Sequence, residues 1–541
     1  MSFIDDWVDK LRNLFRGEPK GRRKEPDLSS GGSGSNDRRK MWIGHAVSRL
    51  DEGDLSVLPT VYSGLVNSEP ADVQRCAAAI RRTLEPWLVG ARLEGMKKIF
   101  QQYTSLLWFG DWRQVSPGDF EFRIDDQDDL FAVLALGSFH PCGYFREKCL
   151  VRLESFGGRS LPPVILAINN WVETVRRKAF EISGRLINSA SLDEVLAALG
   201  ILEKVRRGER RNAADLQTLL QLAAARIKAR SADLSPEMIL RLDNSARRLA
   251  GPIILFGRLL SETDELRLLR GEPDPANQRR LAEPLLARDT VSAEILDYLR
   301  QSRSAALRLD LLKHWPKWSD RPMADLESFI FDAQVGVREY ARFLLRKNGV
   351  TDFASKYRLA VGTNLSVGAV AGLGETGEPE DAALVEPLLN SGRPALIKAA
   401  LTALAALKGQ DCAETLLKFL TEPASGGRAY FLALKLKLVL PSAQLYEAFF
   451  KTEQPAARAR LARVISRQDR WDQLPYLIKL LPAAEGELRN WIERQLLDWA
   501  PAYTRPYPSQ LEIITQTLAA ENIPSDVRKN LELTLKALDL I

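Results

Sequence analysis

The chain contains few of the residues on which small stapled folds and metal sites depend. Its 541 residues include only four cysteines. They form no CxxC pair, so neither a disulfide framework nor a zinc site is predicted, and their scarcity fits a reducing compartment. No uncharged apolar run reaches the ~18 residues that a membrane-spanning helix needs. The N-terminus also lacks the contiguous apolar core of a signal peptide. A cytoplasmic protein is therefore expected.

Catalytic signatures are missing as well. Only three histidines are present, His45, His140 and His314, and they lie far apart in the sequence. No HExxH, GxSxG, Walker or GxGxxG pattern occurs. The sequence His140-Pro141-Cys142 is interpreted as a turn between helices, because a nucleophile needs a base and an orienting group that the sequence does not supply. The sequence predicts no catalytic residue, no cofactor and no metal.

A strong charge imbalance is also lacking. The 76 basic and 70 acidic residues leave a net charge of +6, a weak excess that is compatible with nucleic acid but does not require it. The length exceeds the ~250–300 residues at which single cores stop growing. The chain must therefore form several domains or one repetitive array.

A recurring phrase indicates the repetitive array. It consists of an aliphatic residue, Arg or Lys, two variable positions and a small or apolar residue, as in Val337-Arg338 with Ala341. At position 368, where the period expects a basic residue, the phrase Val367-Gly368 with Ala371 has glycine instead. A fixed repeat period is typical of solenoids. The basic positions follow steps of 30 residues, simple multiples of 30, or once 31: 146, 176, 308, 338, 398, 428, 458 and 489.

Each repeat has the same internal pattern, which is clearest over residues 380–409. Apolar residues recur at spacings of three and four, which is the helical period. The turn at Asn390-Ser391-Gly392, followed by Pro394, separates two helices. Neither helix can bury its apolar stripe alone, whereas stacked pairs bury it continuously. The sequence thus predicts an all-α solenoid over residues 38–541.

The phrase AGLGETGEPEDAALVEPLL, together with the helix around Ile397-Lys398, resembles HEAT-like repeats of the phycobilisome-lyase type. The resemblance covers most of residues 140–541 and is clearest over 337–405. It implies an α–α superhelix whose inner surface binds other molecules, with enzymatic activity the exception. Among the repeats, the regular arginines are expected to be structural, with stems that cover apolar surface and heads that meet a turn carboxylate.

One segment departs from the helical pattern. Residues 111–124 contain the turn Ser116-Pro117-Gly118-Asp119, and the alternation of Phe120, Phe122 and Ile124 predicts a small hairpin inserted in the array. The acidic cluster that follows, at residues 125–129, lacks the Gly and Glu of a calcium-binding loop. Its side chains are predicted to cap the helix that begins near Leu130.

The first sixteen residues predict an amphipathic helix. Its seven apolar side chains fall within one arc of ~140°, and acids precede bases as the helix dipole favours. The Gly-, Ser- and charge-rich stretch 17–37 is predicted to be a flexible linker. The candidate docking residues are Phe3, Ile4, Trp7, Val8, Leu11, Leu14 and Phe15.

Three interpretations of this helix stay open. It could dock into a partner's groove, fold back over the terminal face of the solenoid, or lie on a membrane with residues 1–24 in contact. The first is preferred and the membrane is the least favoured, because the polar face carries as many acids as bases, whereas interfacial helices favour a basic face.

The preferred function is a non-catalytic protein–protein interaction scaffold or adaptor in a multiprotein complex. One alternative is nucleic-acid binding, including a DNA-glycosylase-like enzyme that would use an Asp beside a Trp, as in Asp111-Trp112, Trp471-Asp472 or Asp498-Trp499. Another is a bilin lyase or chaperone, which the family resemblance suggests. The candidate anionic-ligand patch is Arg206, Arg207, Arg210 and Arg211.

Overall fold

The computed structural model describes residues 33–66, 68–88, 93–101, 111–208, 213–317, 323–501 and 505–541, with side chains from residue 40 onward. Among these residues the regular secondary structure is helical and none lies in a strand. The predicted all-α class is confirmed. Contacts divide the chain into two compact units, Met1–Arg288 (unit 1) and Asp289–Ile541 (unit 2).

Unit 1 consists of short and medium helices joined by tight turns. Its α-helices are α2 (Ser33–Asp51), α3 (Leu58–Ser63), α4 (Pro70–Leu84), α5 (Leu93–Gln101), α6 (Gly118–Glu121), α7 (Gln127–Gly137), α8 (Gly143–Leu153), α9 (Leu161–Ala167), α10 (Glu173–Ser189), α11 (Leu192–Arg206), α12 (Ala213–Ala229), α13 (Pro236–Arg241), α14 (Asn244–Phe256), α15 (Glu262–Gly271) and α16 (Pro275–Leu286).

Unit 2 repeats the same pattern more regularly. Its α-helices are α17 (Ala293–Gln301), α18 (Ala305–His314), α19 (Met323–Ser328), α20 (Val335–Lys347), α21 (Phe353–Thr363), α22 (Val367–Thr376), α23 (Ala382–Val385), α24 (Pro394–Lys408), α25 (Ala413–Phe419), α26 (Gly426–Lys435), α27 (Ser442–Lys451), α28 (Pro455–Ile465), α29 (Arg470–Leu480), α30 (Gly486–Leu497), α31 (Pro508–Ala520) and α32 (Ser525–Ala537).

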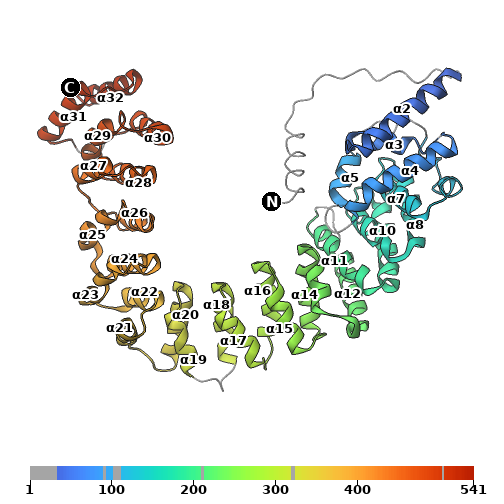
Figure 1. Ribbon diagram of the computed structural model, residues 1–541, viewed down its shortest axis with the longest axis horizontal. Coiled ribbons are helices and arrows are strands. Elements are labelled where there is room, and N and C mark those ends of the chain that lie inside the picture. Colours follow the sequence, from blue (N-terminus) through green and yellow to red (C-terminus); the bar gives the residue numbers. More distant parts are fainter. Residues whose placement is uncertain are drawn as a thin grey trace. The chain divides into compact units, whose positions relative to one another are not determined.

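The helices of unit 2 lie in two rows (Figure 1). The second helix of each pair contacts the second helix of the next, from α18 through α20, α22, α24 and α26 to α28. We call these the second-row helices. The first helices of the later pairs, α27, α29 and α31, contact one another in the same way and belong to the first row. Pairs stacked in sequential order are the defining arrangement of a solenoid.

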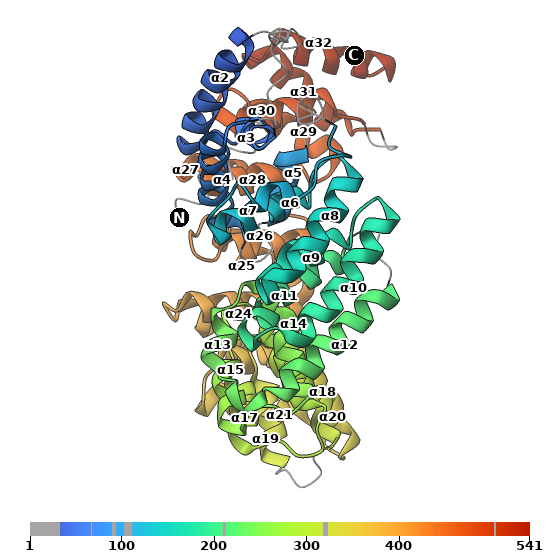
Figure 2. The same cartoon turned by 90° about the vertical axis from the view of Figure 1, so that its right-hand side faces the viewer.

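Unit 1 shows the same neighbour-to-neighbour stacking. Helices α8, α10, α12, α14 and α16 contact each other in succession, and Figure 2 shows α8, α10 and α12 side by side. Helix α11 packs against α9, α12 and α14. The predicted solenoid is therefore present within each unit.

The core runs lengthwise between the rows, as the apolar period predicts. In α24, Leu396, Ala400 and Leu404 are fully or almost fully buried. Small residues at the helix contacts let the backbones approach closely. A Cβ on Gly374 of α22 would lie 2.4 Å from the Cα of Ala403 in α24, closer than atoms pack in a protein interior. Stacking of this kind joins the later repeats of unit 2 into one continuous hydrophobic cluster.

The linker prediction was wrong at its C-terminal end, because α2 begins at Ser33 and includes residues 33–37. Ile43, Val47 and Leu50 of this helix are buried, and α2 packs on α3 and α4. Once packing has nucleated a helix, each added residue costs little, so the helix extends into a polar segment. The rest of the predicted linker and the helix 1–16 lie outside the described residues.

The hairpin prediction for residues 111–124 was also wrong. This segment forms turns and the short helix α6, and none of its residues is in a strand. Phe120 and Ile124 are buried whereas Phe122 is 91% exposed, so the alternation comes from a helical turn that docks one side. The capping prediction is confirmed, because Asp126 accepts hydrogen bonds from the backbone N–H groups of Asp128 and Asp129 at the start of α7.

Within the described ranges, no helix is both long enough and apolar enough to cross a bilayer.

Candidate functional site

The regularly spaced arginines have a structural role. Several donate a hydrogen bond to the carbonyl oxygen six residues earlier, in the turn between the paired helices. Arg146 donates to His140 O over 2.6 Å, Arg176 to Asn170 O over 3.0 Å and Arg458 to Thr452 O over 2.8 Å. The expected turn carboxylate is found in some repeats, for example Asp332 beside Arg308. These groups stabilise turns, so they are committed to the fold.

Arg428 departs from this role. It keeps the sequence period, but Gly427 precedes it where other repeats have an aliphatic residue. The buried position is taken instead by Ala429, which turns the arginine outward. Its Nε donates to the hydroxyl of Thr402 over 2.8 Å, and its guanidinium lies over the ring of Phe431. This half-buried arginine contacts Thr402 and Phe431 in place of a turn carbonyl, which the sequence period did not predict.

The candidate anionic-ligand patch is partly neutralised. Arg206 and Arg207, at the end of α11, both donate to Glu203, whose side chain is only 2% exposed. Burial alone would raise the pKa of Glu203, but the hydrogen bonds and charges of the two arginines bring that pKa below its ordinary value. Arg248 of α14 adds a third guanidinium 3.7 Å from this carboxylate. The remaining predicted members, Arg210 and Arg211, lie outside the described residues.

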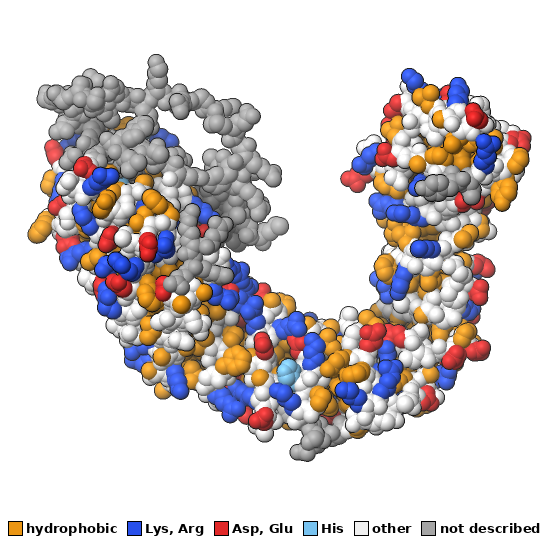
Figure 3. Space-filling model, turned by 180° about the vertical axis from the view of Figure 1, so that it is seen from behind, with side chains coloured by type: hydrophobic (Ala, Val, Ile, Leu, Met, Phe, Trp, Pro, Cys, Tyr) orange, Lys and Arg blue, Asp and Glu red, His pale blue; other side chains and the backbone are white. Residues whose placement is uncertain are grey.

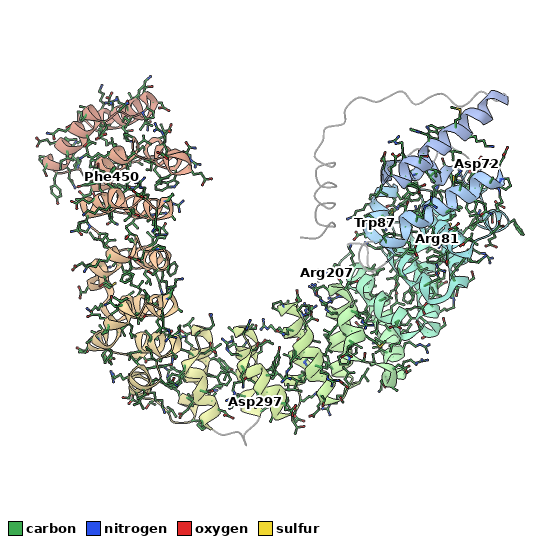
Figure 4. All side chains as sticks on the ribbon, in the orientation of Figure 1. Asp72, Arg81, Trp87, Arg207, Asp297 and Phe450 are labelled. Atoms are coloured by element: carbon green, nitrogen blue, oxygen red, sulfur yellow. The ribbon has the colours of Figure 1, made fainter. Side chains whose placement is uncertain are left out.

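The folded chain brings further lysines to this place. A pocket of about 510 Å³ opens beside α5, α9, α11 and α14. Figure 4 places Arg207 at the end of α11. Glu94 of α5 forms an ion pair with Lys204 of α11 over 2.9 Å. The charged residues lining the pocket are Glu94, Lys97, Lys98, Glu203, Lys204 and Arg207.

Sequence reasoning missed the contribution of α5 to this pocket. About 110 residues, the length of a typical domain, separate Lys97 and Lys98 from Arg207 in the sequence. No spacing rule connects residues so far apart. Their tertiary neighbours determine their role, since Lys98 and Lys204 both pair with Glu94, and Arg207 pairs with Glu203. The net charge of the six lining residues is therefore modest, which favours a structural role for the pocket over a strong anion site.

His140 lies in the core of unit 1 and has no solvent access. Its Nδ1 accepts a hydrogen bond from the backbone N–H of Cys142 over 3.0 Å, so the proton resides on Nε2. Its ring centroid is 4.2 Å from that of Trp112. Burial, and then the charge of Arg146, lower the pKa of His140 to about 3. The turn interpretation of His140-Pro141-Cys142 agrees with this geometry.

This burial predicts acid sensitivity. In the unfolded chain His140 takes up a proton below its ordinary pKa of ~6.5, whereas in the folded chain it does so only near pH 3. The contribution of neutral His140 to the free energy of unfolding is therefore complete above pH 6.5 and is lost as the pH falls from 6.5 toward 3. We expect His140 to contribute a loss of about 2 kcal/mol between pH 7 and pH 5. Urea titrations at both pH values should show this loss in the natural chain and a smaller one in His140→Asn. Equal losses would contradict the prediction.

The Trp–Asp pairs that a glycosylase-like site would need do not form such a site. Trp471 and Trp499 are buried and in edge-to-face contact, with ring centroids 5.3 Å apart. Asp472 faces the surface, where its carboxylate accepts a hydrogen bond from Gln510. Trp112 is buried beside His140. The tryptophan rings belong to the core. Trp471 and Asp472 both line a pocket of about 460 Å³, but the Trp471 side chain is only 3% exposed.

Comparisons with known proteins give distant similarities. No family model matches the chain, and no curated protein matches its sequence. The chain is similar to importin beta crystallised in ammonium sulfate, with a TM-score of 0.30 and 12% identity over 100% of this chain and 69% of that chain. It is similar to the AP-3 complex in an intermediate open conformation, with a TM-score of 0.25 and 9% identity over 93% and 96%. The S. pombe condensin Cnd3–Cnd2 subcomplex gives a TM-score of 0.24 and 12% identity over 99% and 96%. The fold assignment rests on the stacked helix pairs themselves.

Proposed function

We propose that the chain is a non-catalytic scaffold that binds other proteins along the exposed faces of its helices and acts as an adaptor in a multiprotein complex. The regular arginines and His140, groups that catalysis would recruit, are engaged in turns and core. The family resemblance and the cytoplasmic location stay predictions from the sequence.

An aromatic patch on the first-row helices of unit 2 carries the proposal. Phe450 of α27 is 49% exposed and is labelled on this helix in Figure 4. Its ring is 5.0 Å from that of Tyr446, which in turn lies 5.7 Å from Tyr476 of α29. We call Tyr446, Phe450 and Tyr476 the aromatic patch. Phe450 is exposed, whereas Tyr446 and Tyr476 are half-buried and pack on the core. Exposed aromatic surface costs free energy in water, and aromatic side chains are enriched at the centres of protein interfaces.

The amphipathic helix predicted for residues 1–16 supplies a second contact in this proposal. Burial of its seven apolar side chains would release on the order of 10–20 kcal/mol before the cost of ordering the segment is subtracted. A helix that inserts its apolar stripe into a partner's groove uses this gain, and the segment that follows it gives the helix reach. Binding to the solenoid itself and to a membrane are the competing outcomes.

Affinity purification of the tagged chain from its native cell, with quantitative mass spectrometry, tests the proposal. We expect Phe450→Glu to deplete one set of partners, because a charge in the aromatic patch prevents its desolvation. Deletion of residues 1–32, which ends before α2, should deplete partners without changing the melting temperature.

Two matched substitutions serve as controls. Leu533→Glu alters an exposed apolar residue on α32, outside the aromatic patch, and should retain the partners. Lys10 is on the polar face of the predicted helix, so Lys10→Glu should deplete fewer partners than Leu11→Glu, which places a charge on the apolar face. If the deletion lowers the melting temperature, the helix folds back on the solenoid. If neither Phe450→Glu nor the deletion changes the set of partners, the scaffold proposal is wrong.

A further inference from the structure

Charge is segregated between the two rows of unit 2. The second-row helices α24, α26 and α28 contain seven basic residues and no Asp or Glu. The acidic residues of the same repeats lie on first-row helices and turns, for example Glu414 of α25 and Glu447 of α27. In Figure 3, the arm on the right contains these helices, and blue side chains gather along its left edge whereas red ones gather along its right edge. One face of this part of unit 2 is therefore basic.

Within the described residues, four outward-facing cations of these helices lack carboxylate partners, whereas Lys408 of α24 pairs with Glu386. Lys398 and Lys435 are exposed, as is Arg463. Together with Arg428 they define what we call the basic face: Lys398, Arg428, Lys435 and Arg463. Among the residues that the structure describes, none of the four forms an ion pair with a carboxylate. Arg428 bonds only to the neutral hydroxyl of Thr402. This contrasts with Arg206 and Arg207 of unit 1, which share Glu203.

Aromatic rings lie among these cations. The Arg428 guanidinium carbon is 5.5 Å from the ring centroid of Phe431, and Phe431 is 52% exposed. The Arg463 guanidinium carbon is 5.9 Å from the ring centroid of Trp491 in α30. Each guanidinium lies over a ring, and a guanidinium in this position can still donate hydrogen bonds to a carboxylate. Arginine and large aromatic residues are also the side chains that contribute most to protein interfaces.

We propose that the basic face binds an acidic segment of a partner protein that also carries large apolar side chains. This inference rests on the proposed scaffold function and specifies the chemistry of one partner. Carboxylates would pair with the four cations, and apolar side chains would cover Phe431. A nucleic acid would favour a dense track of cations that matches its phosphates. Here each helix presents only one or two cations, next to a ring, so protein is the favoured class.

Fluorescence anisotropy with the full-length chain tests this proposal. The probe is a short labelled peptide in which Glu and Asp alternate with Phe and Leu. We expect saturable binding that weakens with salt. The double substitution Arg428→Glu/Arg463→Glu should weaken binding by about tenfold or more, because it places two repelling charges on the face. The milder Arg428→Gln/Arg463→Gln should give an intermediate loss, and circular dichroism should show that both variants are folded.

Lys418→Glu is the matched control, because Lys418 is 72% exposed on first-row helix α25 of the same unit and pairs with Glu414. It makes the same kind of charge reversal outside the basic face and should leave binding unchanged. Absence of peptide binding, or an equal loss in Lys418→Glu, would overturn the proposal. So would tighter binding of an oligonucleotide that the double substitution abolishes. If the peptide fails while purification still recovers partners that depend on Phe450, the scaffold function stands and only this surface is rejected.

Discussion

Replacement of Gly368 by alanine is expected to destabilise unit 2 by about 3 kcal/mol or more, the upper range for overpacking a core. A Cβ at this position would lie 1.8 Å from the carbonyl oxygen of Phe331 and 2.6 Å from that of Asp332. Both are backbone atoms, so relief requires a whole turn to move. The repeat period would place arginine at 368, and that substitution should be worse still. Urea titration monitored by circular dichroism measures the change.

Gly336 supplies the control for this experiment. It lies in α20 of the same unit, and a Cβ on it would meet no atom within 4 Å. Gly336→Ala should therefore be neutral or stabilising by about 0.5–1 kcal/mol, because alanine restricts the unfolded chain. If both glycine substitutions gave the same result, the close approach of α22 to the turn at Phe331 would be wrong.

Replacement of Glu375 by alanine should cost on the order of 3 kcal/mol, as expected when one partner of a buried ion pair is removed. Arg338 and Arg342 both donate hydrogen bonds to Glu375, and their side chains are only 3% and 6% exposed. Burial alone would lower the pKa of Arg342, but Tyr357 and Glu375 raise it above its ordinary value. Arginine is not deprotonated in proteins, so both guanidiniums stay charged when the carboxylate is removed. Urea titration of Glu375→Ala measures the loss.

An exposed ion pair of the same unit gives the comparison. Lys356 and Glu327 are each 35% exposed and lie 3.4 Å apart. Glu327→Ala should change stability by less than about 1 kcal/mol, because solvent screens a pair of this kind and both partners regain freedom. A loss in Glu375→Ala as small as that in Glu327→Ala would show that Arg338 and Arg342 find other partners or water.

The repeat period predicted where the arginines lie but only in part what they do. At Arg146, Arg176 and Arg458 the local sequence places the guanidinium over its own turn, six residues back, so the structural role follows from short-range geometry. At Arg428 the preceding residue is glycine, and a shift of the buried position to Ala429 reverses the outcome. A local sequence pattern predicts a contact between residues close in the sequence. The prediction fails where the buried positions of a helix shift by a residue or two.

The surfaces that could bind partners were harder to predict. The aromatic patch joins α27 to α29, and the basic face joins three successive second-row helices. Each brings together residues from helices about one repeat apart in the sequence. The hairpin error over residues 111–124 has a related cause, because alternation over a few residues also fits one side of a short docked helix.

The sequence by itself determined that this chain is a stack of helix pairs. Apolar spacing of three and four, with Gly and Pro at the turns, is a local property, and paired stripes that cannot be buried alone must stack. Only the tertiary structure decided the contacts between repeats. Gly368 has no room for a Cβ, Glu375 pairs with both Arg338 and Arg342, and Arg428 bonds to Thr402. These depend on distances between repeats of a few tenths of an ångström to a few ångströms, which close packing determines and sequence spacing does not.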